Sequence, residues 1–106
     1  MPASQLDLPA LAKAVSDAYD ASIDLALDSA TRQDFKDKAD ALSKRFDQLS
    51  GHWFETTTAE FTAASKTLDE SLDAMQKPLD DAANAVAALG LLKSLTGALD
   101  AVLGLL

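Results

Sequence analysis

The sequence contains no cysteine and little of what sheets and tight turns are built from. Its 106 residues include 4 Gly, 3 Pro, 1 Trp, 1 Tyr and 4 Phe. The absence of cysteine excludes disulfides, thiolate metal sites and cysteine nucleophiles. Val, Ile and aromatic residues, which favour strands, are scarce, whereas Ala and Leu, which favour helices, dominate the apolar fraction. The composition therefore predicts an all-α fold.

Basic residues are also in short supply. There are 9 Lys and Arg against 17 Asp and Glu, which gives a net charge of −8 and a pI near 4.3. The basic residues are scattered and form no cluster of the kind that nucleic acids or lipid headgroups require. Phosphate backbones and anionic lipid surfaces repel such a chain on average. We expect no nucleic-acid partner, and the charge does not favour a membrane partner.

No residue pattern identifies a catalytic chemistry. His52 is the single histidine, so a zinc site would have to be assembled from scattered carboxylates, and an exposed loop histidine is the simpler interpretation. Apart from Asp100, the acidic residues belong to polar stretches, which do not raise a carboxyl pKa for acid–base work. Asp100 lies in an apolar stretch and is interpreted as the polar edge of a helix. We expect no catalytic residue, no cofactor and no metal, and therefore not an enzyme.

Apolar residues recur at spacings of three and four, the period of an amphipathic helix. The pattern predicts a single domain over residues 1–106, an antiparallel bundle of three or four long amphipathic helices after a flexible lead at 1–6. The main turn is predicted near 50–57, because Gly51 can end a helix and three threonines follow. The predicted helices cover residues 8–29, 32–50, 57–76 and 78–104. Within each pair the helices are either separate or continuous, since Thr31 either breaks or bends the first pair and Pro78 either kinks or restarts the second.

The C-terminal segment, residues 85–106, is apolar around most of a helical circumference. Its only charges are Lys93 and Asp100. Such a helix has to be buried in a bundle or in lipid. On insertion scales its Leu and Val residues contribute roughly −0.3 to −0.6 kcal/mol each, against about 2.5 to 3.5 for each central charge. The apolar and the charged contributions to the insertion free energy nearly cancel. A stable single transmembrane helix is therefore not favoured, although the segment is long enough to cross a membrane.

These features predict a non-catalytic interaction protein that binds itself or another helical protein. The small residues of the segment step by four and three along one seam, which lets a second helix approach closely. Trp53 at the main turn either covers the end of the core or recognises a partner. The predicted partner-binding residues are Gly90, Leu92, Leu95, Gly97, Leu99, Ala101, Leu103, Gly104 and Trp53. The alternative is a membrane-active protein, pore-forming or toxin-related, whose Leu-rich end inserts after a conformational change.

One stretch resembles a known family. Leu49, Gly51, Trp53, Phe61, Leu68, Leu72, Met75 and Leu79 are similar to the second half of the small secreted helical hairpins named for their Trp-x-Gly turn (WXG/Esx-type). The resemblance covers residues 40–89 and implies a bacterial protein that pairs as a four-helix dimer and is secreted without a leader. The position two after Trp53 is Glu55 rather than glycine. Because residues 1–11 lack the pattern of a secretory signal, we expect a cytoplasmic protein or one exported without a cleaved signal peptide.

Overall fold

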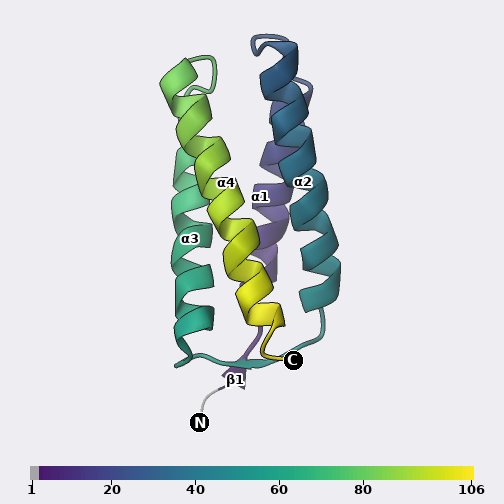
Figure 1. The fold of residues 1–106 in the computed structure, drawn as a ribbon, viewed down its shortest axis with the longest axis vertical. Coiled ribbons are helices and arrows are strands. Elements are labelled where there is room, and N and C mark those ends of the chain that lie inside the picture. The colour runs from purple at the N-terminus through teal and green to yellow at the C-terminus, as the bar shows by residue number, and fades with distance from the viewer. Residues whose placement is uncertain (1–2) are drawn as a thin grey trace.

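Four helices run up and down the long axis of the molecule in residues 3–106, which the computed structural model describes (Figure 1). The helices are α1 (Leu8–Ser22), α2 (Ser29–Leu49), α3 (Ala59–Met75) and α4 (Ala82–Leu103). Two short strands, β1 (Ala3–Ser4) and β2 (Phe54–Glu55), pair antiparallel across one end. The predicted all-α antiparallel bundle is confirmed, with four helices, and the small sheet is an addition to it.

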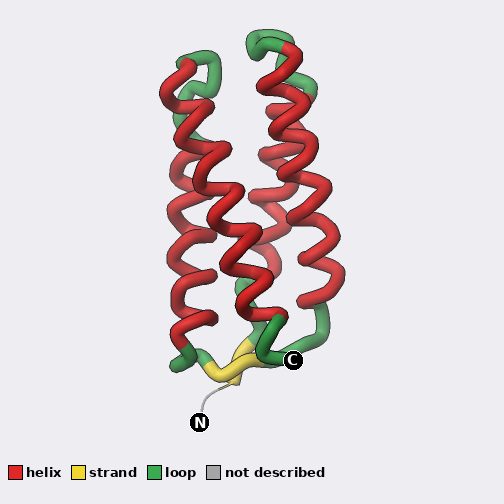
Figure 2. Tube along the Cα trace, in the orientation of Figure 1, coloured by secondary structure: helices red, strands yellow, loops and turns green. Residues whose placement is uncertain are grey.

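The helices pack as two hairpins set side by side. The α1–α2 pair and the α3–α4 pair are each antiparallel, and the hairpins join through contacts of α1 with α3 and of α2 with α4. The connection between α2 and α3 crosses one end of the bundle, the end that also holds the sheet and the C-terminus (Figure 2). The two shorter loops lie together at the opposite end. A helix in this arrangement shows one side to the core and the other to solvent.

Each helix begins at a side chain that caps it. An N-cap oxygen accepts a hydrogen bond from a backbone N–H that has no partner inside the helix. The capping residues are Asp7, Asp28, Thr58 and Asp81, which accept from the N–H groups of Ala10, Thr31, Phe61 and Ala83 at 3.1, 2.7, 3.3 and 2.9 Å. The caps explain the observed boundaries better than the apolar period does.

Each of the two predicted helix pairs consists of two separate helices, not of one continuous helix. The first helix ends at Ser22 rather than at 29, because Asp28 caps the next helix and residues 23–28 form the loop. Thr31, the predicted break, lies in the first turn of α2. Pro78, where a kink or a restart was predicted, lies in the loop after α3, and α4 begins at Ala82 behind the Asp81 cap rather than at 78. The predicted turn near 50–57 is where the chain crosses the end of the bundle.

The lead predicted to be flexible is ordered from residue 3. Ala3 pairs with Glu55 and Ser4 with Phe54 through the backbone. Leu6 is only 2% exposed, so it anchors this segment in the core. Residues 1–2 lie outside the described part of the chain. The prediction for residues 3–6 was wrong because one buried leucine is enough to tie down a short segment.

Small residues allow α3 and α4 to pack closely. Ser71 is fully buried, and its hydroxyl donates to the carbonyl oxygen of Thr67 at 2.8 Å and approaches that of Leu91 on α4 at 3.3 Å. A buried hydroxyl with acceptors nearby carries no desolvation penalty. The core around this contact is formed by the largest fully buried apolar side chains: Leu11, Phe35, Leu42, Leu49, Leu68, Leu92, Leu95, Leu99 and Val102.

Candidate interaction surface on helix α4

The leucine side of α4 is the core side. Leu92, Leu95 and Leu99 are 0% exposed, and Leu103 is half-buried. They pack inward because α4 contacts both α3 and α2. We predicted these four residues as partner-binding, and for Leu92, Leu95 and Leu99 this is corrected, because a partner has no access to them while the bundle is folded.

The other side of α4 faces solvent and carries only small residues along one line. We call it the α4 seam: Ala83, Ala87, Gly90, Ser94, Gly97, Ala101 and Gly104, all exposed. Successive members are separated alternately by four and three residues, so they follow one stripe along the helix. Figure 1 views this part of the molecule with α4 in front of the other helices. The structure therefore brings four of the predicted residues, Gly90, Gly97, Ala101 and Gly104, to one surface.

The packing of the chain itself does not require two of the seam glycines. A Cβ atom added at Gly90 or at Gly97 would meet nothing within 4 Å in the described structure. Glycine inside a helix is less stable than alanine by about 0.8 to 1.0 kcal/mol, because its backbone loses more freedom on folding. The monomer thus carries two destabilising residues on its surface without a compensating contact.

The charges on α4 also lie near the seam. Lys93 and Asp100 are both exposed and are seven residues apart, so they occupy the same side of the helix. Asp100 accepts two hydrogen bonds from the guanidinium of Arg45, from Nε at 2.8 Å and from Nη2 at 3.1 Å. Arg45 also donates to the carbonyl of Ala41 at 2.8 Å. The bidentate pair ties α4 to α2 and fixes the position of Asp100 beside the seam.

An apolar patch continues the seam at the end of the bundle. We call it the end patch: Trp53, Leu105 and Leu106, which are 63%, 45% and 61% exposed. These residues line an open hollow of about 290 Å³ together with Phe54, Glu55 and Thr58. Isolated apolar residues are common on surfaces, but three that adjoin one another and an uncharged helix stripe mark a contact area.

Phe54, not Trp53, closes the end of the core. Phe54 is 5% exposed, and its ring lies against Phe61 with the ring centroids 6.5 Å apart. The strand geometry decides this, because successive side chains point to opposite sides. Of the two roles that we predicted for Trp53, covering the core therefore belongs to its neighbour. Trp53 is left at the surface beside the end patch leucines.

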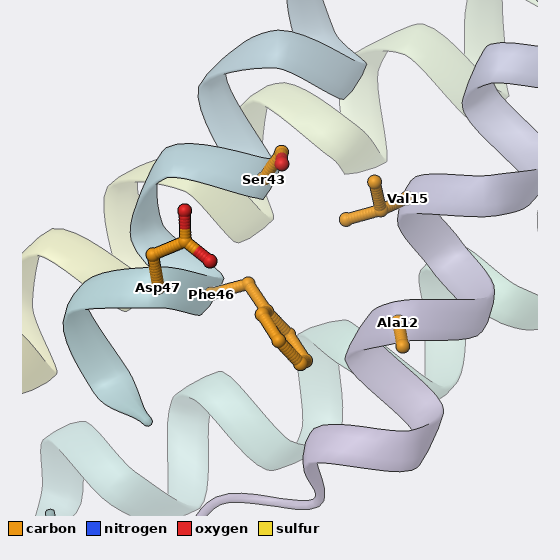
Figure 3. A pocket seen from close by; sticks show the side chains of 5 residues that line it. All are labelled: Ala12, Val15, Ser43, Phe46 and Asp47. Carbon is orange, nitrogen blue, oxygen red and sulfur yellow. The ribbon is translucent and has the colours of Figure 1, made fainter. Parts of the chain in front are cut away.

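A shallow groove lies between α1 and α2. It encloses about 280 Å³ and is lined by Ala12, Val15, Ser43, Phe46 and Asp47. Figure 3 shows Val15 and Phe46 directed into the space between the two helices. Its polar side chains are one hydroxyl and one carboxylate, without a base beside the serine to activate it. The groove offers apolar contact and no arrangement for catalysis.

Two titratable groups with shifted pKa values, Tyr19 and Asp40, join α1 to α2 at the surface. The Tyr19 hydroxyl donates a hydrogen bond to the Asp40 carboxylate. This bond lowers the pKa of Asp40 and raises the pKa of Tyr19, because it stabilises the carboxylate and the protonated phenol together. Both groups are exposed and lie in none of the hollows described above. We interpret the pair as a link between helices.

The described residues contain no group of three or more His, Cys, Asp or Glu side chains placed to hold a metal ion. The chain matches no family model, no curated protein and no solved structure in the comparisons with known proteins. The resemblance to the Trp-x-Gly hairpins implies that the helices on either side of Trp53 pair with each other. The strongly packed antiparallel pairs are instead α1 with α2 and α3 with α4. The resemblance stays a prediction.

Proposed function

We propose that this chain is a non-catalytic interaction protein that self-associates or binds a helical partner through the α4 seam and the end patch. The observation that supports this most strongly is the row of exposed small residues on α4, with two glycines that touch nothing in their own chain. A protein that keeps such residues has a smooth, narrow surface on which a second helix can lie close to the backbone.

Electrostatics favours the same face. The chain carries a net charge of −8, so most approaches of another acidic surface are repelled. The outer face of α4 carries Lys93 and Asp100, whose charges cancel. Burying this face therefore removes few charged groups from water, and desolvation of charge is the main obstacle to burying a polar surface.

The test is the molar mass in solution, measured by light scattering over a range of concentrations. Gly97→Leu places a branched side chain on the seam, where it has room in the monomer but would keep a partner helix away. Ala63→Leu is the matched control, because Ala63 is also exposed but belongs to α3 rather than to the α4 seam. We expect the wild-type chain and the control to associate and Gly97→Leu to remain monomeric.

A foreign helical partner is tested with the same variants as bait. A protein captured by the wild type and by Ala63→Leu but not by Gly97→Leu binds at the seam. If the wild type is monomeric at all concentrations and capture is indifferent to Gly97→Leu, the proposed function is wrong.

The second candidate is a membrane-active protein whose C-terminal helix inserts into lipid. One observation favours it: α4 is long and apolar enough to cross a membrane by length and composition, and only 28% of its most apolar window is buried in the bundle. Insertion would require the bundle to open, because Leu92, Leu95 and Leu99 are in the core. Approach to an anionic membrane is easier in acid, because protonated carboxylates no longer repel the lipid surface.

Flotation with liposomes that contain anionic lipid separates the two candidates. A membrane-active chain floats at acidic pH and stays in solution at neutral pH. If it stays in solution under both conditions, the second candidate is ruled out and the first is untouched.

A further inference from the structure

We infer that the partner of the α4 face is a second copy of this chain and that the two α4 helices pack antiparallel. The inference rests on the proposed function and adds the identity and direction of the partner. Its basis is the placement of charge on α4 and on the two ends of the bundle, considered together with the spacing of the seam.

The two charges beside the seam are complementary only in one direction. Lys93 and Asp100 lie on the same side of α4, one heptad apart. If two copies pack parallel about a twofold axis along the helices, the flank with Lys93 and Asp100 faces the opposite, uncharged flank of the other copy, and neither charge meets a partner. If they pack antiparallel about a twofold axis between these residues, each Lys93 faces the Asp100 of the other copy. Opposite charges at the flanks of a helix pair select its orientation.

Asp100 is positioned to take part in this contact. Its side chain stays 55% exposed although it accepts two hydrogen bonds from Arg45. A carboxylate has acceptor sites beyond the two bonds of an arginine fork. A lysine from a second copy can therefore add to the pair with Arg45 instead of replacing it.

The distribution of acidic residues along the bundle points the same way. The end that holds the two short loops is strongly acidic, and most of its carboxylates line two hollows that share Leu79. They outnumber the nearby cations Arg32, Lys77 and Lys13, the last of which pairs with Asp17 at 2.8 Å. The carboxylates are those of Asp17, Asp20, Asp24, Asp28, Asp80 and Asp81. Parallel packing would set two such ends side by side, whereas antiparallel packing holds them at opposite ends of the pair, beyond the screening distance of about 8 to 10 Å.

The spacing of the seam fits an antiparallel pair over its whole overlap. With Ser94 of one copy opposite Gly97 of the other, Gly90 lies opposite Ala101 and Ala87 opposite Gly104. Every layer of the contact then consists of two small residues, which permits the close approach of two helix axes. Val86, which is 70% exposed, comes to the level of Leu105 in the end patch of the other copy. Exposed apolar residues from both ends of α4 thus lie at matching levels in the same complex.

Cysteine cross-linking tests the direction directly, because the chain contains no native cysteine. Gly90→Cys and Ala101→Cys variants are oxidised separately and as a mixture. We expect the mixture to give a disulfide-linked heterodimer and each variant alone to give little. In the proposed register two copies of residue 90 are about 16 Å apart along the axis, too far for a disulfide. Ala63→Cys on α3 measures cross-linking by random collision.

A charge variant gives a second measurement that does not depend on a disulfide. Lys93→Glu places a glutamate opposite Asp100 of the other copy in both symmetry-related contacts. We expect this repulsion to raise the dimer dissociation constant about tenfold at low salt. Lys66→Glu on α3 makes the same charge change at an exposed position away from the seam. It should change the constant no more than the added net charge alone does.

The outcomes separate this inference from the proposed function. If Gly90→Cys cross-links with itself and not with Ala101→Cys, the pair is parallel, and the inference is wrong while self-association through α4 stands. If the chain is a monomer that still captures a partner through Gly97, the second copy is the wrong occupant and the proposed function stands. If Lys93→Glu and Lys66→Glu behave alike, the charge argument for direction is refuted.

Discussion

Replacing the exposed glycines of α4 with alanine should stabilise the monomer. The Cβ atoms added at Gly90 and Gly97 meet nothing within 4 Å, so the double variant Gly90→Ala/Gly97→Ala introduces no clash. Each replacement removes the helix-propensity cost of glycine, about 0.8 to 1.0 kcal/mol, and two distant exposed sites add nearly independently. The expected gain in the free energy of unfolding is about 1.6 to 2.0 kcal/mol.

For a chain of 106 residues this gain corresponds to a rise in Tm of about 7 to 9 °C, since the unfolding entropy is near 2.1 cal/mol/K per residue. Thermal unfolding is followed by circular dichroism at a protein concentration low enough for the chain to be monomeric. Dilution matters because association of the folded state also raises the apparent Tm. A concentration series for both proteins separates the stability of the monomer from the contribution of the partner.

A Tm that stays constant or falls at low concentration would refute the reasoning. It would mean that the backbone around Gly90 and Gly97 does not have the open space described above, or that the helix there depends on glycine. A raised Tm at low concentration, together with a weaker concentration dependence, would show that the glycines cost the monomer stability and serve an intermolecular contact.

Phe54→Ala should destabilise the bundle by about 3 to 5 kcal/mol and Trp53→Ala by no more than about 0.5, measured by denaturant unfolding, because only the phenylalanine is buried; equal losses would contradict this placement. Leu95→Ala should cost about 2 to 5 kcal/mol in the same assay, since Leu95 is fully buried, and a smaller loss would mean that the leucine side of α4 is not the core side. The single tyrosine, Tyr19, should titrate above its ordinary pKa of 10.0 by phenolate absorbance and return toward that value in Asp40→Asn. The Tyr19–Asp40 pair should stabilise the fold fully between the ordinary pKa of Asp40, 3.8, and that of Tyr19, 10.0. This contribution is lost as pH falls through the lowered carboxyl pKa or rises through the raised phenol pKa. An unshifted phenolate transition would rule out the hydrogen bond.

Helix α4 has two roles, one on its inner side and one on its outer side. Its inner side supplies Leu92, Leu95 and Leu99 to the core, and its outer side presents the α4 seam. A bundle of this size has no fifth helix to cover the outer side within residues 3–106. The structure thus leaves a long, charge-poor face of small residues on a protein of net charge −8.

The helix boundaries show where local sequence is insufficient. Residues 18–30 contain enough Ala and Leu to continue a helix, so the apolar period ran past the true end at Ser22. Asp28 lies inside the first predicted helix, 8–29, and only the structure identifies it as the cap of α2. Capping depends on which backbone N–H groups lose their partners, and that follows from where the chain turns.

The sequence by itself determined the helical class, the position of the crossing turn, an interruption of the helix at Pro78, and the presence of a C-terminal helix apolar on nearly every side. Local propensity and periodicity are enough for these features, because each depends on neighbours within one or two turns of the chain. The tertiary structure alone decided which side of α4 is hidden, since burial depends on α2 and α3, which are distant in sequence. For the same reason only the fold could place Leu92, Leu95 and Leu99 in the core, put Phe54 rather than Trp53 over the end of it, and leave the glycines in solvent.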